Sequence, residues 1–147
     1  MSWLTKIFGG PGRADRVDYY EEGLALAQEG KFHEALTSLR LALKEEPGDP
    51  IVLQQIAIAY TRIGMEEEAM KTYRHVLHRN PESPGAHYGL AFLLLRHGSH
   101  ADAIQHLEAF LARTPSDVDA RDHIVHARRT LRELQGEDGE EPGEDDA

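Results

Sequence analysis

The sequence has no cysteine among its 147 residues. This absence excludes disulfide bonds, thiol catalysis and zinc sites with cysteine ligands. No apolar run approaches the roughly 20 residues that a membrane-spanning helix needs. The opening MSWLTKIFGG has only a very short apolar stretch and no evident cleavage site, so it does not resemble a secretory signal. We therefore expect a cytoplasmic protein.

A surplus of basic residues is also lacking. The formal net charge is -10, but seven of the acidic residues lie in the stretch 136–147. Without that stretch the 26 acidic residues fall to 19 against 16 basic ones, a net charge of -3. Nucleic-acid binding requires a clustered basic face, so we expect no nucleic-acid partner. The acidic stretch has no apolar residue except Ala147, and this composition predicts disorder.

Signatures of catalysis are missing as well. No serine lies in a glycine-rich elbow beside a base, and GGPG at 9–12 lacks the lysine of a phosphate-binding loop. Nine histidines include three pairs spaced three apart: His75 with His78, His97 with His100, and His123 with His126. Within a helix that spacing puts both rings on one face, but His97 and His100 flank Gly98, and no pair has an obvious third ligand at helical spacing. We expect no enzyme, no cofactor and no metal site.

What the sequence does contain is an internal repeat of 34 residues. Three residue types recur in phase: Gly30, Gly64 and Gly98; Ala35, Ala69 and Ala103; Pro47, Pro81 and Pro115. A fixed period of this length predicts a helical repeat array. The first helices are expected over 18–29, 51–63 and 85–97, each ending at the phased glycine. The second helices are expected over 32–45, 66–79 and 100–113, each ending before the phased proline.

Small residues within each copy let the paired helices approach closely: Gly23, Ala57 and Ala91 in the first helices, and the phased alanines in the second. Larger apolar residues then fill the space between the helices: Leu26, Tyr60, Leu94, Leu39, Tyr73 and Leu107. One helix pair cannot bury its own apolar face, so neighbouring copies must stack. The fold class predicted is all-α, a right-handed α-solenoid of antiparallel helix pairs.

The stretch after Pro115 predicts one more helix, with Ile124, Leu131 and Leu134 on roughly one side. One apolar face and one charged face are typical of a terminal capping helix. The predicted organisation is therefore an N-terminal apolar segment and linker (1–15), three repeats (16–49, 50–83 and 84–117), a capping helix (118–135) and an acidic tail (136–147).

These residues resemble the tetratricopeptide repeat family over about 16–117, and the second copy, LQQIAIAYTRIGMEEEAMKTYRHVLHRNP, carries the resemblance best. Five positions depart from the family pattern: Glu22 and His87 stand at usually apolar places, Phe110 at a usually small one, and Glu66 and His100 in place of aromatic residues. The resemblance implies that the first helices line a concave groove that binds peptides or partner helices.

On that resemblance the concave face consists of Val17, Tyr20, Leu24, Ala27, Ile51, Gln54, Ile58, Thr61, Gly85, Tyr88, Phe92 and Leu95. Leu24, Ile58 and Phe92 are one period apart and would form an apolar ridge. Exposed apolar surface of this kind usually marks an interaction site. The predicted partner-binding residues are Tyr20, Leu24, Gln54, Ile58, Tyr88, Phe92 and Leu95. The alternative is that the capping helix and neighbouring repeats cover part of the ridge.

The family also includes members that clamp the C-terminal carboxylates of heat-shock chaperones with cationic and amide side chains. The matching positions here are Tyr20, Leu24, Gln55, Gly85 and Gly89. None of them is cationic, so a carboxylate clamp is not expected.

The N-terminal segment is apolar on one side if helical, through Trp3, Leu4, Ile7 and Phe8. Three interpretations are open: contact with a membrane surface, docking onto a protein surface that includes the chain's own groove, or a passive end. The main functional hypothesis is a protein-interaction adaptor that binds an apolar peptide or amphipathic helix. The alternatives are a peripheral membrane scaffold, anchored by residues 3–8 and self-assembling into a homo-oligomer, and a small chaperone for a secreted or membrane client.

Overall fold

The structure is a computed structural model that describes residues 17–114 and 118–136. Within those ranges all regular structure is helical: α2 (Tyr19–Gln28), α3 (Phe32–Glu45), α4 (Pro50–Arg62), α5 (Glu66–Arg79), α6 (Pro84–Arg96), α7 (His100–Ala112), the 3-10 turn η1 (Val118–Ala120) and α8 (Arg121–Leu134). The apolar N-terminal residues Trp3, Leu4, Ile7 and Phe8, and the acidic stretch beyond Gly136, lie outside the described residues. The all-α solenoid prediction is confirmed.

The six repeat helices begin and end within one residue of the positions that the sequence predicts. Gly30, Gly64 and Gly98 have φ angles of +80°, +85° and +79°, the left-handed conformation that closes a helix at little cost only for glycine. Pro50 and Pro84 start α4 and α6. Proline is favourable there because the first N–H of a helix has no acceptor within the helix, so its absence breaks no hydrogen bond.

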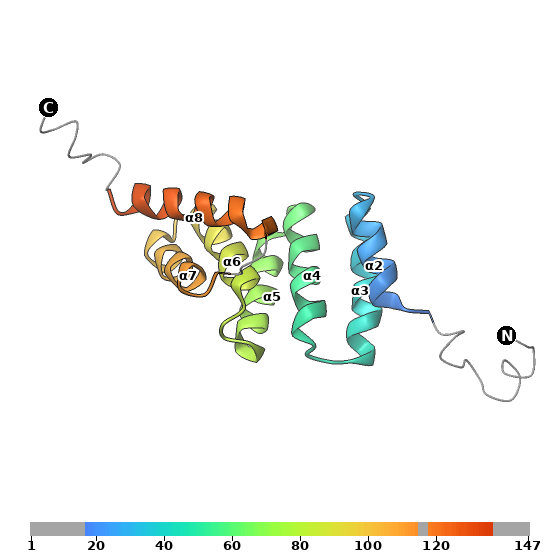
Figure 1. Cartoon of the computed structure of the whole chain (residues 1–147). Helices are drawn as coiled ribbons and strands as arrows, with labels where there is room; N and C mark the ends of the chain where they lie inside the picture. The colour runs from blue at the N-terminus through green and yellow to red at the C-terminus, as the bar shows by residue number, and fades with distance from the viewer. Residues whose placement is uncertain (1–16, 115–117, 137–147) are drawn as a thin grey trace, which may run out of the picture.

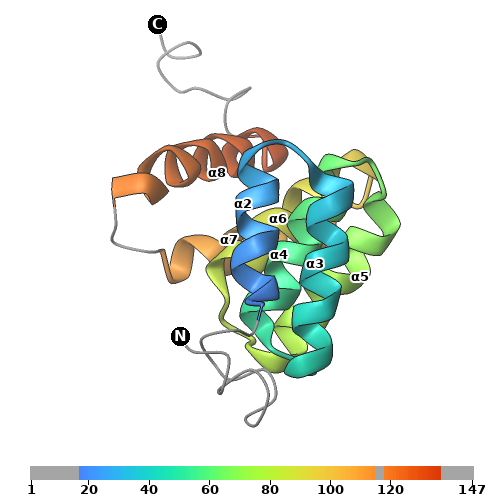
Figure 2. The same ribbon diagram turned by 90° about the vertical axis from the view of Figure 1, so that its right-hand side faces the viewer.

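The helices pair as α2 with α3, α4 with α5, and α6 with α7. The phased alanines are fully buried at 0% exposure, as are Ala57 and Ala91. A Cβ atom at Gly23 would lie 2.7 Å from Cγ of Leu39, so only glycine permits this approach of α2 to α3. Figure 2 shows that α2, α4 and α6 form one layer and that α3 and α5 form another. The pairs stack into a continuous apolar core.

Three of the five departures from the family pattern, Glu22, His87 and Phe110, have local partners. Ser38 is buried on α3, and its hydroxyl donates to the Glu22 carboxylate over 2.6 Å. His87 on α6 lies against His106 on α7, with their Nδ1 atoms 3.0 Å apart. Phe110 is only 3% exposed and its ring lies 5.1 Å from that of Tyr88. Each of these three residues therefore has a specific side-chain contact in the fold.

Helix α8 lies across the end of the array and packs against α7 (Figure 1). Ile124, Leu131 and Leu134 pack onto a second apolar cluster built on Ala91, Leu107, Phe110 and Ala127. The predicted apolar side of the capping helix is thus the side that docks. Among the described helices, none has the length and hydropathy required to span a bilayer.

Candidate functional site

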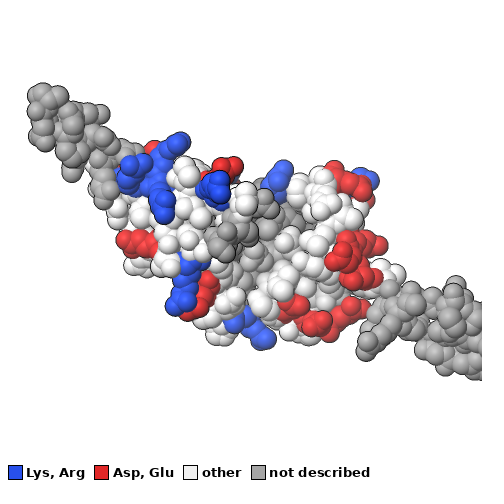
Figure 3. Space-filling model, viewed as in Figure 1, with Lys and Arg blue, Asp and Glu red and all other residues white. Residues whose placement is uncertain are grey.

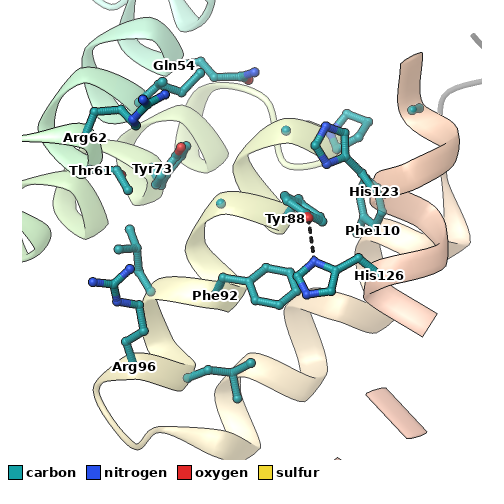
Figure 4. A pocket seen from close by; sticks show the side chains of 17 residues that line it. Gln54, Thr61, Arg62, Tyr73, Tyr88, Phe92, Arg96, Phe110, His123 and His126 are labelled. Carbon is teal, nitrogen blue, oxygen red and sulfur yellow. Dashed lines mark hydrogen bonds between the residues drawn. The ribbon is translucent and has the colours of Figure 1, made fainter. Parts of the chain in front are cut away.

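A groove of about 730 Å³ opens between α4, α6 and α8 in the described part of the chain. Its lining is mainly apolar and aromatic, with a few polar groups (Figure 4). The lining residues are Gln54, Ile58, Thr61, Arg62, Tyr73, Pro84, Gly85, Tyr88, Gly89, Phe92, Leu93, Leu95, Arg96, Phe110, Ala120, His123 and His126. Concave, mostly apolar surfaces with few polar groups are where proteins usually hold ligands.

Two glycines of α6 shape the floor of the groove. A Cβ atom at Gly89 would lie 2.5 Å from the Tyr73 hydroxyl oxygen, and one at Gly85 would lie 2.9 Å from the side-chain amide carbon of Gln54. The missing side chains of the two glycines therefore leave room for Tyr73 of α5 and Gln54 of α4 to pack against α6. Burial raises the pKa of Tyr73 to about 12, although a hydrogen bond with Thr61 opposes the shift. The phenol is consequently neutral at physiological pH.

The wall nearest the end of the array is an aromatic cluster centred on Tyr88. Its ring centroid lies 4.9 Å from that of Phe92 and 4.8 Å from that of His123. Its hydroxyl is 3.0 Å from Nδ1 of His126, which in turn stacks on Phe92 (Figure 4). Burial raises the pKa of Tyr88 above its usual value. The two histidines come from α8, so the capping helix forms one side of the groove.

Charged groups stand at one edge, in the last turns of α4 and α6. The guanidinium carbon of Arg62 lies 4.6 Å from the centre of the Phe32 ring, a cation–π contact. Arg96 is paired with Glu66, with Nη2 and Oε2 2.6 Å apart. Among the described residues that line the groove there is neither Asp nor Glu.

Five of the seven predicted partner-binding residues line this groove: Gln54, Ile58, Tyr88, Phe92 and Leu95. Tyr20 and Leu24 do not. Tyr20 instead lines a separate hollow of about 300 Å³ beside α2, with Asp18, Asp49 and Ile51 among its neighbours. Burial raises the pKa of Tyr20, and the carboxylates of Glu21 and Asp49 add to the shift. Leu24 is half-buried on α2, so the apolar ridge does not continue as a groove over the first repeat.

Sequence reasoning missed Arg62, Arg96, Tyr73 and the α8 histidines as lining residues. Arg62 and Arg96 are one 34-residue period apart, and this recurrence in the sequence could have identified them as residues of the groove. Within the described ranges no three His, Asp or Glu side chains are grouped as metal ligands.

Comparisons with known proteins agree with this architecture. The tetratricopeptide repeat family profile matches residues 26–78 and 64–123. No curated protein matches the chain.

Among similar solved structures is the Yersinia enterocolitica type III secretion chaperone SycD with a peptide of the translocator YopD (TM-score 0.73, 15% identity). Also similar is PcrH with the chaperone-binding region of PopD (TM-score 0.72, 16% identity). A third similar structure is the first TPR of Spaghetti (RPAP3) with an HSP90 peptide (TM-score 0.68, 19% identity). Each alignment covers 80% of this chain and 89% of the other. With three in-phase repeats, a capping helix and a profile match across 26–123, the chain belongs to the tetratricopeptide repeat family.

Proposed function

We propose that this protein is a non-enzymatic protein-interaction adaptor that binds an apolar peptide or an amphipathic helix of a partner in the groove between α4, α6 and α8. The observation that carries the proposal is the groove itself, with a volume of about 730 Å³ and a mainly apolar lining. Grooves of this kind accept an amphipathic helix or an extended apolar segment. The similar structures with bound peptides support the same class of function.

The residues assigned to binding are Ile58, Tyr88, Phe92 and Leu95, with Gln54 at one end. Ile58 is the sharpest position for a test. It is half-buried on the α4 wall, whereas Phe92 stacks on His126 and its replacement would also disturb α8. A charge at Ile58 would remain unpaired beneath an apolar partner, which is costly.

The test compares Ile58→Glu with Leu41→Glu. Leu41 is 36% exposed on α3, a helix that contributes nothing to the groove lining, so the control makes the same chemical change on another surface. Proteins cross-linked to the wild type in native cells should be retained by Leu41→Glu and lost by Ile58→Glu, with helicity preserved in both. Retention of the same proteins by Ile58→Glu would refute groove binding.

The chaperone alternative uses the same groove, because a client would also present an apolar segment. The type III secretion chaperones among the similar structures support this alternative. Co-expression distinguishes the two roles: a chaperone raises the soluble yield of its captured partner, whereas an adaptor leaves that yield unchanged.

A further inference from the structure

The groove has a charge character opposite to that of the chain. The sequence contains 26 acidic against 16 basic residues, yet the charged side chains among the described lining residues are those of Arg62 and Arg96, with the imidazoles of His123 and His126 on the α8 side. Among the described lining residues the formal charges are the two guanidinium groups, and an apolar wall with positive charge at its edge favours an occupant that brings negative charge.

Arg62 is the group best placed to receive that charge. Its guanidinium is held against the ring of Phe32, which restricts its position without using its N–H donors. No ion pair with Arg62 is recorded among the described residues. An arginine fixed in this way can donate two parallel hydrogen bonds to a carboxylate.

Arg96 occupies the equivalent place one repeat later. It pairs with Glu66 through Nη2, and Glu66 also lies 3.1 Å from Nε2 of His97. Arg96 is therefore partly neutralised, and we assign it the secondary role. It keeps further N–H donors for an incoming carboxylate, because a guanidinium carries five.

The surrounding surface adds to the same field. Figure 3 shows acidic side chains gathered over α2 at one end of this face, and Lys and Arg gathered over α8 at the other. Helix α8 contains four arginines against Asp122 and Glu133, whereas α2 has acidic residues and no basic one. The positive side of the groove is therefore the side of α6 and α8.

The chain's own ends do not match these requirements. Residues 1–16 include the apolar Trp3 to Phe8 but carry Lys6, Arg13 and Arg16 against Asp15 alone. Residues 136–147 carry the acids but no apolar side chain other than Ala147. Neither of these two segments combines both characters, which favours an occupant from another protein.

We infer that the partner segment is an apolar stretch with at least one Asp or Glu side chain within it, placed between Arg62 and Arg96 at the edge of the groove. This inference rests on the proposed function and specifies its ligand. It differs from capture of a C-terminal carboxylate, because the two arginines stand in the last turns of α4 and α6 and not at the clamp positions, among them Gly85 and Gly89 on the floor.

The test is a selection from a library of random sixteen-residue peptides, displayed with their C-terminal ends fused to the carrier so that no free carboxylate is available. The full-length wild type is the bait, and clones that also bind the Ile58→Glu variant are removed. We expect the remaining peptides to be enriched in large apolar residues and in Asp or Glu. A selected peptide should bind Arg62→Gln roughly threefold to tenfold more weakly in fluorescence anisotropy, and Arg96→Gln less so, each the loss of one partly exposed ion pair.

Two controls make the result specific. Arg113→Gln removes an exposed arginine that pairs with Glu82 on another surface, and it should leave the affinity unchanged. A version of the peptide with Gln in place of its acidic residues should bind the wild type and Arg62→Gln equally.

Each remaining outcome is decisive. Apolar peptides without acidic enrichment, or an Arg62→Gln affinity equal to that of the wild type, would overturn the inference and leave the proposed function intact. If no peptide depends on Ile58, both the proposed function and the inference fail.

Discussion

The Phe92 ring of α6 and the His126 imidazole of α8 stack almost face to face, with ring centroids 4.6 Å apart and planes inclined by 10°. The same imidazole lies 3.0 Å from the Tyr88 hydroxyl through Nδ1. One side chain therefore joins the capping helix to two residues of the groove wall. This contact adds to the packing of Ala127, Ile124, Leu131 and Leu134 that docks α8 on the array.

The His126→Ala variant should loosen α8 without unfolding the repeats. Loss of the stack and the hydrogen bond is expected to cost about 1 kcal/mol in the free energy of unfolding. Hydrogen exchange should accelerate at the α8 amides and not at those of α4. His75→Ala, at an exposed position on α5, is the matched control. Equal protection of α8 in the two variants would contradict the proposed role of His126.

Replacing Gly89 with alanine should destabilise the protein, although alanine is the better helix former by about 1 kcal/mol. The added Cβ atom would lie 2.5 Å from the hydroxyl oxygen of Tyr73, which is only 4% exposed and has little room to move. We expect a loss of about 1–3 kcal/mol from this overpacking, measured by urea denaturation.

Gly85→Ala is the comparison within the same helix. Its Cβ atom would meet the end of the Gln54 side chain, which is flexible and half-buried, so the variant should be close to wild type in stability. A Gly89→Ala protein as stable as Gly85→Ala would show that Tyr73 is not confined.

The repeat architecture could be predicted because three residue types mark the same helix ends in every copy. Gly30, Gly64 and Gly98 are constrained by backbone geometry, so they fix the helix boundaries regardless of how the copies pack. The buried alanines likewise report a local steric requirement. The sequence therefore predicts the helix boundaries and the close helix contacts, because each depends on a residue type that recurs at the same place in every repeat.

The shape of the groove could not be predicted in the same way. It depends on where α8 docks, and α8 lies outside the period. The spacing of His123 and His126 places both rings on one face of the helix, but no sequence pattern shows which helix that face contacts. Leu24 is in phase with Ile58 and Phe92, yet none of the helices within 17–114 and 118–136 stands opposite it as α8 stands opposite Phe92. Equivalent sequence positions differ here because their tertiary neighbours differ.

Stability should decrease as the pH falls below neutral, in part through His106. Burial lowers the pKa of His106 below its usual 6.5, and the nearby His87 and Arg74 add to the effect while Asp102 opposes it. The unfolded chain therefore takes up the proton first, so stability is lost as pH falls through about 6.5 and levels off below the folded pKa.

The contact between the two rings limits the number of protons that the pair can hold. The carbonyl oxygen of Pro81 lies 2.8 Å from Nε2 of His87 and can only accept. His87 therefore donates from Nε2, and because the two Nδ1 atoms face each other at 3.0 Å, only one of them can carry a proton in this contact. Urea denaturation at pH 7.5 and 5.5 should show a smaller pH effect in His106→Gln than in the wild type. An identical pH dependence would exclude His106 as a contributor.

The hydrogen bond between Ser38 and Glu22 should appear as coupling in a double-mutant cycle. Ser38 is 4% exposed, and its hydroxyl donates to the Glu22 carboxylate over 2.6 Å. Glu22→Leu restores the apolar residue usual in the family but leaves a buried hydroxyl without this acceptor. Ser38→Ala removes the donor and leaves the carboxylate to water.

We expect each single variant to lose about 1–2 kcal/mol, as for a hydrogen bond to a charged group. The Glu22→Leu/Ser38→Ala variant should then recover most of the loss, because an apolar pair replaces a polar one at the same place between α2 and α3. The coupling free energy from urea denaturation should reach about 1 kcal/mol. Simple additivity of the two losses would mean that Ser38 bonds its own helix backbone as readily, and that Glu22 departs from the family pattern without structural reason.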